Sequence, residues 1–311
     1  MTALPLVTGA TGFAGGHLLD QLSKQGPLHA WSNPAGRHAA RSGESNGISW
    51  RAVDLLDRDA VRRAIGEVRP AVIYHCAGVA DVHGSWQSPG RVLRVNVMAT
   101  HNVAIAAAEA GVGVLITSSA LVYRPSVGAL DEEHAIGPTT PYGVSKVAQE
   151  MAALESGAPI LLARPFNPAG PHQEDAYVTS AFAHQIARIE AGRDEPVLRV
   201  GNLDSRRDIT DVRDTVRGYR AIVASGAPGR PYNVCRGTAY RVGDLLDILL
   251  SLARVQVRIE QDPARLRPSD NPIVLGDRRR IAAETGWVPE IPIEQTLADL
   301  LDDWRRRVAE E

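Results

Sequence analysis

The sequence predicts an α/β protein in which a doubly wound parallel sheet is followed by a smaller C-terminal α/β domain. Short β-branched runs alternate with segments of helical period through the first half of the chain, as expected for successive βαβ units. A glycine-rich turn directly follows the first of these runs. The chain has 311 residues, of which 44% are hydrophobic, so it is long enough for about two well-cored domains.

The alternation predicts the individual elements of the first half in order. Strands are expected at 4–7, 28–31, 48–53, 71–76, 114–117 and 160–163, and helices at 14–24, 57–66, about 90–110 and from 141 onward. Gly111 is a typical C-cap, and Pro141 after Thr140 is typical of a helix start. This pattern is that of a Rossmann-type domain over residues 1–165.

The second half is rich in Pro, Gly and Arg and predicts fewer regular elements. Helices are expected at 182–190, 211–223 and 242–253, and a strand at 232–235. We expect a segment at about 208–236 to return to the first domain, and residues 166–311 to form mainly the second domain.

Composition and charge exclude several classes of protein. With 34 basic against 36 acidic residues the net charge is −2, which argues against a nucleic-acid partner. No apolar run reaches the roughly 18 residues of a membrane span, so no membrane partner is expected. Two cysteines, Cys76 and Cys235, make a disulfide scaffold or a metal site improbable. A cytoplasmic location and no metal are the resulting expectations.

The turn Thr8-Gly9-Ala10-Thr11-Gly12-Phe13-Ala14-Gly15 is a candidate phosphate-binding loop. Gly9, Gly12 and Gly15 allow a tight turn, a close approach of backbone to phosphate, and close packing of helix on strand. The free amides and positive end of the following helix, which begins near Phe13 and Ala14, would face a pyrophosphate. A dinucleotide is therefore predicted at this turn; an ordinary strand–helix turn is the alternative.

The residues after the second strand bear on the choice of dinucleotide. NAD sites usually place an acidic residue about 20 residues after the turn, but here Asn33 is followed by Arg37 and Arg41. Arg would pair with a 2′-phosphate where a carboxylate would repel it, so NADPH is favoured over NADH. Asp54 and Leu55 are expected near the adenine, with a capping role for Asp54 as the alternative.

A candidate catalytic pair is Tyr142 and Lys146, which a spacing of four places on one face of the helix that begins at Pro141. Lys146 is one of only two lysines beside 32 arginines, so its presence suggests a role that Arg could not fill. A free Tyr has a pKa of about 10, and a neighbouring ammonium favours its phenolate. The pair is therefore suited to proton transfer, although a surface Tyr/Lys pair is the alternative.

The buried strand 114–117 ends in the hydroxyls of Ser118 and Ser119, at the sheet edge where ligands bind. The glycine turn, Ser119-Ala-Leu-Val-Tyr123 and Tyr142-x-x-x-Lys146 together resemble the extended short-chain dehydrogenases/reductases over essentially the whole chain. The resemblance selects Ser119 over Ser118. It implies that Ser119 orients a carbonyl, Tyr142 is the acid/base, Lys146 lowers the Tyr142 pKa and binds the nicotinamide ribose, and Ala77 contacts the cofactor.

Motifs in the second half are similar to those of nucleotide-sugar-modifying members, above all GDP-4-keto-6-deoxy-D-mannose reductases and GDP-mannose 4,6-dehydratases. They are Arg164-Pro-Phe-Asn167, Val200-Gly-Asn-Leu-Asp204, Arg207-Asp-Ile-Thr-Asp-Val-Arg-Asp214 and Arg267-Pro-Ser-Asp270. The resemblance implies that Asn167 contacts the sugar or phosphate, Arg207 and Arg267 clamp the pyrophosphate, and Asp270 holds the nucleotide ribose. Each arginine read by itself is equally compatible with a surface charge.

One position separates reduction from dehydration within this family. Dehydratases carry a Glu or an Asp-Glu pair just after the catalytic hydroxyl, where this chain has Ala120-Leu121. Neither side chain can move a proton, so we expect reduction of the C4 ketone of GDP-4-keto-6-deoxy-D-mannose to a GDP-6-deoxyhexose, GDP-D-rhamnose being the favoured product. A nucleotide-sugar 4-epimerase with retained NAD and a non-catalytic dinucleotide-binding protein are the alternatives.

A second copy of the chain is the expected partner. The Ala-rich helix at 90–110 and the helix from 142 carry more small apolar faces than one domain should expose. Family members pair these helices into a dimer interface, so the resemblance implies a homodimer.

Overall fold

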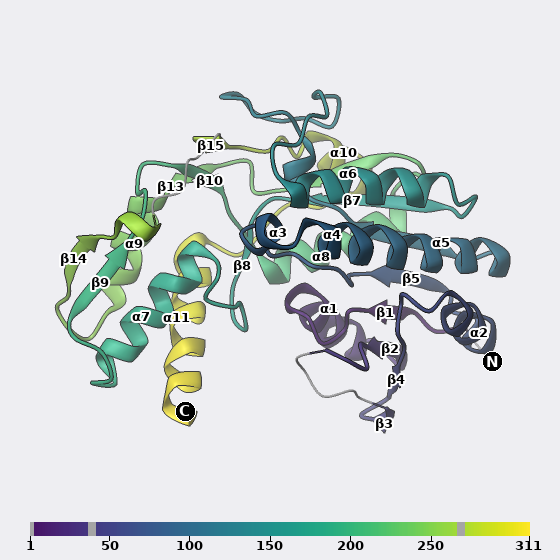
Figure 1. The fold of residues 1–311 in the computed structure, drawn as a ribbon, viewed down its shortest axis with the longest axis horizontal. Coiled ribbons are helices and arrows are strands. Elements are labelled where there is room, and N and C mark those ends of the chain that lie inside the picture. Colours follow the sequence, from purple (N-terminus) through teal and green to yellow (C-terminus); the bar gives the residue numbers. More distant parts are fainter. Residues whose placement is uncertain (1–2, 37–41, 266–270) are drawn as a thin grey trace.

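The computed structural model describes residues 3–36, 42–265 and 271–311 of the chain. Within these ranges, eight strands form one large sheet in the order β12-β7-β6-β5-β1-β2-β4-β3 (Figure 1). In that order they are β12 (Pro231–Val234), β7 (Ile160–Pro165), β6 (Gly113–Thr117), β5 (Val72–His75), β1 (Leu6–Thr8), β2 (Leu28–Ser32), β4 (Ile48–Ala52) and β3 (Gly43–Ser45).

All neighbouring pairs in this sheet are parallel except β3 with β4. The chain builds outward from β1 to β2 and β4 on one side and to β5, β6, β7 and β12 on the other. The strand order therefore reverses between β1 and β5, and open α/β sheets bind ligands beyond the carboxyl ends of the strands at such a point. The predicted doubly wound parallel sheet is confirmed, with β3 as an antiparallel edge strand that the prediction lacked.

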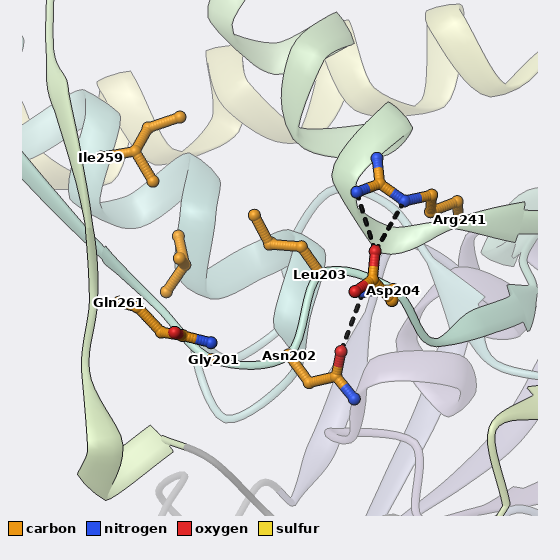
Figure 2. Close-up of a pocket in the computed structure, with 8 residues that line it drawn as sticks. Gly201, Asn202, Leu203, Asp204, Arg241, Ile259 and Gln261 are labelled. Carbon is orange, nitrogen blue, oxygen red and sulfur yellow. Dashed lines mark hydrogen bonds and ion pairs between the residues drawn. The ribbon is translucent and has the colours of Figure 1, made fainter.

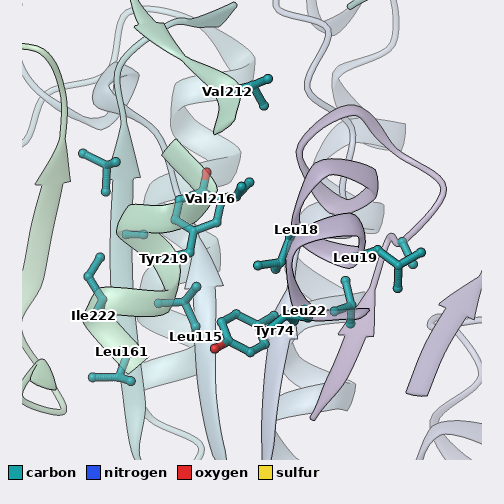
Figure 3. Close-up of a cluster of buried hydrophobic side chains, with 14 of the residues drawn as sticks. Leu18, Leu19, Leu22, Tyr74, Leu115, Leu161, Val212, Val216, Tyr219 and Ile222 are labelled. Carbon is teal, nitrogen blue, oxygen red and sulfur yellow. The ribbon is translucent and has the colours of Figure 1, made fainter. Parts of the chain in front are cut away.

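Helices cover both faces of the large sheet. One face packs against α1 (Phe13–Ser23) and α8 (Val212–Ser225), and Figure 3 shows their side chains meeting Tyr74, Leu115 and Leu161 from three adjacent strands. The opposite face packs against α2 (Arg58–Val68), α5 (Ala99–Ala110) and α6 (Pro141–Leu154). Successive strand residues point to opposite faces, so strands covered on both sides are apolar throughout.

The helical region predicted at about 90–110 is interrupted. It consists of α4 (Pro89–Leu93), a π-helical turn (Arg94–Met98) and α5, and the short α3 (Gly84–Gln87) precedes it. The π turn contains Asn96, whose buried amide accepts from Val79 N (2.7 Å) and donates to Val79 O (3.1 Å) and Ser145 Oγ (2.9 Å). Single π turns are often found at functional sites. Here the turn lets Asn96 tie the loop after β5 to α6.

The remaining elements gather at one end of the molecule, away from α2 and α5 (Figure 1). A second core forms among α7 (Val178–Glu190), α9 (Val242–Leu252) and α11 (Ile293–Glu310). The short strands beside them are β8 (Pro168–Ala169), β9 (Val197–Val200), β10 (Arg206–Asp208), β11 (Thr210–Asp211), β13 (Ala239–Arg241), β14 (Arg258–Gln261) and β15 (Ile273–Val274). Helix α10 (Arg279–Thr285) packs instead with α8. No helix in the described ranges has both the length and the apolar character needed to cross a membrane.

Candidate active site

The carboxyl end of β6 holds two adjacent serines with different partners. The Ser118 hydroxyl donates to the Glu150 carboxylate, which is itself bound by Arg164 through Nε (2.9 Å) and NH2 (2.6 Å). The Ser119 hydroxyl accepts from Leu121 N (3.1 Å) at the start of the short 3-10 helix η2 (Ala120–Val122). Ser118 is therefore bound to a buried ion pair, which supports Ser119 as the hydroxyl that meets a substrate.

Helix α6 carries Tyr142 in its first turn. Thr140 caps the helix by accepting from Gly143 N (3.0 Å), and Pro141 supplies a backbone angle suited to the first helical position. Tyr142 is 7% exposed. Burial and the nearby Tyr177 raise the Tyr142 pKa, while a hydrogen bond with the Ser119 side chain lowers it. The structure thus brings Ser119 and Tyr142 together, and the phenol holds its proton at neutral pH.

Lys146 lies one turn further along α6 and is also buried. Its Nζ donates to Thr117 O (2.9 Å) and Gln149 Oε1 (2.8 Å), and it lies 5.7 Å from the centroid of the Tyr142 ring. Burial lowers the pKa of Lys146 to about 8, against the opposing influence of Glu150. A cation held beside the phenol stabilises a phenolate when the phenol gives up its proton.

The glycine turn is shaped for a phosphate. Gly9 has a φ of +68°, and a Cβ there would lie 2.6 Å from the backbone of Ala77, so β1 and β5 approach closely at this point. Gly12 is the N-cap of α1, with no side-chain cap and no acidic residue in the first turn. The first amides of α1, at Phe13, Ala14 and Gly15, are left for an anion. These residues fit the pyrophosphate of a dinucleotide.

The candidate ribose and adenine residues lie at the ends of β2 and β4. Asn33 is exposed, and its Oδ1 accepts from Ala35 N (2.9 Å). Asp54 is exposed and its Oδ1 accepts from Leu56 N (2.9 Å), while the Leu55 carbonyl accepts from Asn102 (2.9 Å). Arg37 and Arg41 lie outside the described residues.

The substrate candidates Asn167 and Arg207 lie close to each other. Asn167 follows β7, the strand beside β6, and its Nδ2 donates to the carbonyl of Asp208 (2.9 Å). Arg207 in β10 donates to the carbonyls of Arg206 (2.8 Å) and Pro272 (3.3 Å). Arg267 and Asp270 lie outside the described residues.

A separate pocket of about 400 Å³ opens among β9, β14 and the start of α9 (Figure 2). It is lined by residues that include 201–204, Arg241 and Gln261, and it contains none of Ser119, Tyr142 and Lys146. Asp204 in this pocket accepts from Arg241 (2.9 Å). The pocket therefore lies apart from the candidate catalytic residues.

Sequence reasoning missed several side chains beside the candidate catalytic residues. Gln149 and Glu150 follow Lys146 on α6. The hydroxyl of Tyr177 donates to Ala80 O (3.2 Å), which bridges the residue before α7 to the loop after β5. Glu150 lies four positions after Lys146 on the same helix, which was an available signal. Tyr177 had no local signal, because its contact spans 97 residues.

Comparisons with known proteins find relatives over nearly the whole chain. Residues 6–300 match the sequence model of the family described as GDP-mannose 4,6 dehydratase. The chain is 36% identical to the GDP-6-deoxy-D-mannose reductase of Pseudomonas aeruginosa over 100% of both chains. It is 26% identical to the UDP-glucose 4-epimerase of Bacillus subtilis, covering 96% of this chain and 95% of the relative.

A solved structure shares the fold over nearly the whole chain. RMD from Pseudomonas aeruginosa complexed with NADPH superimposes with a TM-score of 0.83 at 33% identity, covering 98% of this chain and 100% of that one. The chain is an oxidoreductase-type enzyme of the short-chain dehydrogenase/reductase class that uses a nicotinamide dinucleotide. Within that class, it belongs to the GDP-mannose 4,6-dehydratase family.

Proposed function

We propose that this enzyme reduces the C4 ketone of GDP-4-keto-6-deoxy-D-mannose to a GDP-6-deoxyhexose, GDP-D-rhamnose. The observation that carries the proposal is Ala120-Leu121 directly after Ser119, where a dehydratase of this family needs a carboxylate. The 36% identity to a GDP-6-deoxy-D-mannose reductase supports the same substrate.

Carboxylates brought near this part of the chain by the fold are already bound. Both oxygens of Glu150 accept from Arg164, and one also accepts from Ser118. Glu132 accepts from Asn233 N (2.8 Å) and lies 3.6 Å from the guanidinium of Arg280. Dehydration needs a base at C5 and an acid at O6, and carboxylates engaged in this way are poorly suited to either task.

The three catalytic candidates divide the reduction between them. A reduced nicotinamide dinucleotide held at the glycine turn would supply the hydride that C4 needs. Ser119 donates a hydrogen bond to the ketone oxygen and holds it against Tyr142. Tyr142 transfers its hydroxyl proton to the same oxygen, and the charge left on its phenolate is stabilised by the Lys146 ammonium. The raised Tyr142 pKa suits reduction, because the phenol then carries the proton that the ketone oxygen must receive.

Residues of the second half of the chain would bind the nucleotide sugar. Arg207 and Arg267 would clamp the diphosphate as charge-assisted, bidentate donors, Asn167 would contact the sugar or phosphate, and Asp270 the nucleotide ribose. We place cofactor binding in residues 1–165 with the segment at about 208–236, and sugar-nucleotide binding mainly in 166–311. The separate core among α7, α9 and α11 supports this division.

For the cofactor we propose NADPH in preference to NADH, bound by Gly9, Gly12, Phe13, Ala14, Gly15, Asn33, Arg37, Asp54, Leu55, Ala77, Tyr142 and Lys146. Residues 31–36 contain no acidic side chain that would repel a 2′-phosphate.

Cys76 and Cys235 are free thiols, which fits the cytoplasmic location that we propose.

We also propose that the enzyme is a homodimer. Large apolar side chains are exposed on α3, on the helical segment from α4 through the π turn, and on α6, elements that contact one another. These residues are Trp86, Leu93, Met98, Val144, Met151 and Leu154. Such a patch is unusual on a monomer, and a second copy would cover it. Sedimentation showing only a ~33 kDa species at micromolar concentration would refute the dimer.

A nucleotide-sugar 4-epimerase is the second candidate, favoured by the 26% identity to a UDP-glucose 4-epimerase. Such an enzyme would hold NAD through purification and would need no added reduced cofactor. Reduction that depends on added NADPH or NADH excludes it.

The choice between reduction and dehydration has a direct test. The purified protein is incubated with GDP-mannose and oxidised cofactor, and 4-keto-6-deoxy product is sought by NMR. None is expected, because Ala120 and Leu121 cannot move protons. Formation of the 4-keto-6-deoxy sugar in a preparation free of host dehydratase would overturn the assignment.

A further inference from the structure

A chain of buried hydrogen bonds runs inward from the catalytic lysine. Lys146 Nζ donates to Gln149 Oε1 (2.8 Å), and Gln149 Nε2 donates to Thr100 Oγ1 (2.8 Å). Gln149 has no exposed surface, and neither does Thr100. The Gln149 amide therefore accepts from the Lys146 ammonium through its oxygen and donates to Thr100 on α5 through its nitrogen.

The chain continues across the sheet to the glycine turn. Thr100 Oγ1 lies 2.9 Å from His75 Nε2, and His75 Nδ1 lies 2.8 Å from Thr8 Oγ1. His75 and Thr8 are completely buried, and Thr8 immediately precedes Gly9. Four elements, α6, α5, β5 and β1, are thus joined between the catalytic and phosphate-binding ends of the site.

The ammonium has three protons to place. Thr117 O takes one and Gln149 Oε1 takes another, which leaves one for a ligand or for the Tyr142 phenolate. A flexible lysine head needs such fixed acceptors if its charge is to stay at one point. Without Gln149, the second proton would have no acceptor in this arrangement and the head could rotate.

We propose that Gln149 is a positioning residue of the reaction, which fixes the Lys146 ammonium through the chain Gln149–Thr100–His75–Thr8. This inference rests on the catalytic role of Lys146 in the proposed function. The amide holds the ammonium while adding no charge of its own, so the cation remains available to the phenolate.

The charges that face Lys146 are consistent with this role. Burial lowers the His75 pKa to about 3 and raises the Cys76 pKa to about 12, so both are neutral at pH 7. Tyr142 is neutral for the same reason. Glu150 is the anion of this group, and its carboxylate is bound to Arg164. Gln149 therefore places a neutral acceptor 2.8 Å from the Lys146 ammonium, and a hydrogen bond to the charged form favours that form.

Because the chain has only two lysines, the protonation of Lys146 can be observed directly. Protein labelled with ¹³C at lysine Cε, without cofactor or substrate, gives one signal from Lys146 and one from exposed Lys24 as internal reference. Gln149→Leu removes the acceptor, so the Lys146 midpoint should fall by about one pH unit. Gln149→Glu places a carboxylate there, and the midpoint should rise by at least as much.

Two buried threonines on helices provide a matched control. Thr100→Val removes the hydroxyl that accepts from Gln149, so it interrupts the series of hydrogen bonds one step further from Lys146. It should lower the Lys146 midpoint less than Gln149→Leu does. Thr296→Val on α11 removes a buried hydroxyl that donates to the Asp211 carboxylate (2.8 Å), and it should leave the midpoint unchanged. If Gln149→Leu does not fold, the near-isosteric Gln149→Glu variant carries the test.

Enzyme assays complete the experiment. The alkaline limb of kcat/KM for ketone reduction should move with the midpoint measured by NMR. Lys146 midpoints that agree within about 0.2 unit in wild type and both Gln149 variants would overturn the proposal, as would an equal shift in Thr296→Val. Because the titration needs no substrate, it stands even if the wild-type enzyme fails to reduce the proposed ketone, which would count against the proposed function alone.

Discussion

The proposed catalytic residues and the proposed substrate-binding residues lie in regions of very different construction. Ser119, Tyr142 and Lys146 follow a five-residue strand of the parallel sheet or lie in the first turns of a fourteen-residue helix. Arg207 lies in a three-residue strand, and Asn167 follows the sheet in a backbone conformation with φ of +28°. The proposed catalytic side chains are thus held by a long helix and a strand of the main sheet. The proposed substrate-binding side chains lie on short segments whose contacts join residues far apart in the sequence.

One buried carboxylate holds much of the recognition region together. Asp208 accepts from the amides of Arg236 (2.9 Å), Gly237 (2.8 Å) and Gly276 (3.2 Å), and its carbonyl accepts from Asn167. Burial raises the Asp208 pKa to about 6, although these hydrogen bonds oppose the shift. A shared scaffold for chemistry with a separately built recognition region fits the different nucleotide sugars in the names of the relatives.

The largest expected effect comes from Lys146→Arg, which tests whether the position of the Lys146 charge matters or only its presence. Lys146→Arg keeps the charge, but a planar guanidinium cannot bond Thr117 and Gln149 from the same point. We expect kcat to fall on the order of 10²-fold or more. Lys24→Arg, the other lysine of the chain, is the control and should be silent. More than half the activity in Lys146→Arg would make the Tyr142–Lys146 pair structural.

A change in the recognition region should affect binding instead. Arg207→Ala removes a charged donor for the diphosphate, so the KM for the GDP-sugar should rise by about tenfold or more while kcat changes little. The control is Arg206→Ala, whose side chain points to the other face of the same strand and is more exposed. Steady-state kinetics measure both constants. A loss confined to kcat would break the distinction between the two regions.

The smallest effect concerns the end of β2. Asn33→Asp adds a negative charge near the expected 2′-phosphate, so the KM for NADPH should rise by about fivefold. The KM for NADH, which has no 2′-phosphate, should rise less. The ratio of the two KM values, measured on one preparation, is its own control. An equal change for both cofactors would show that the ribose lies elsewhere.

The same contrast explains which parts of the structure were predictable. The parallel sheet and the placement of Tyr142 on a helix follow from local periodicity and caps, and both were predicted. The π turn around Asn96 was not, because its partners Val79 and Ser145 are 17 and 49 residues away. Helix α11 was not predicted, although its buried residues recur at helical spacing.

Side-chain networks were beyond sequence reasoning for a physical reason. Gln149, Thr100, His75 and Thr8 are separated by 49, 25 and 67 residues, and nothing local marks them as partners. Glu150 and Arg164 are likewise joined only once β7 lies beside β6 and α6. By contrast, the Tyr142–Lys146 spacing lies within one helix, so the sequence alone was sufficient to propose it.

The central claim, that this scaffold reduces a nucleotide-linked ketone, is tested most directly by supplying that ketone. The purified protein is incubated with GDP-4-keto-6-deoxy-D-mannose and, separately, with NADPH or NADH, while cofactor oxidation is followed and the sugar product is identified by NMR. We predict stoichiometric cofactor oxidation, faster with NADPH, and a GDP-6-deoxyhexose reduced at C4 as GDP-D-rhamnose. Unchanged ketone with intact reduced cofactor, from protein whose fold is verified, would contradict the account.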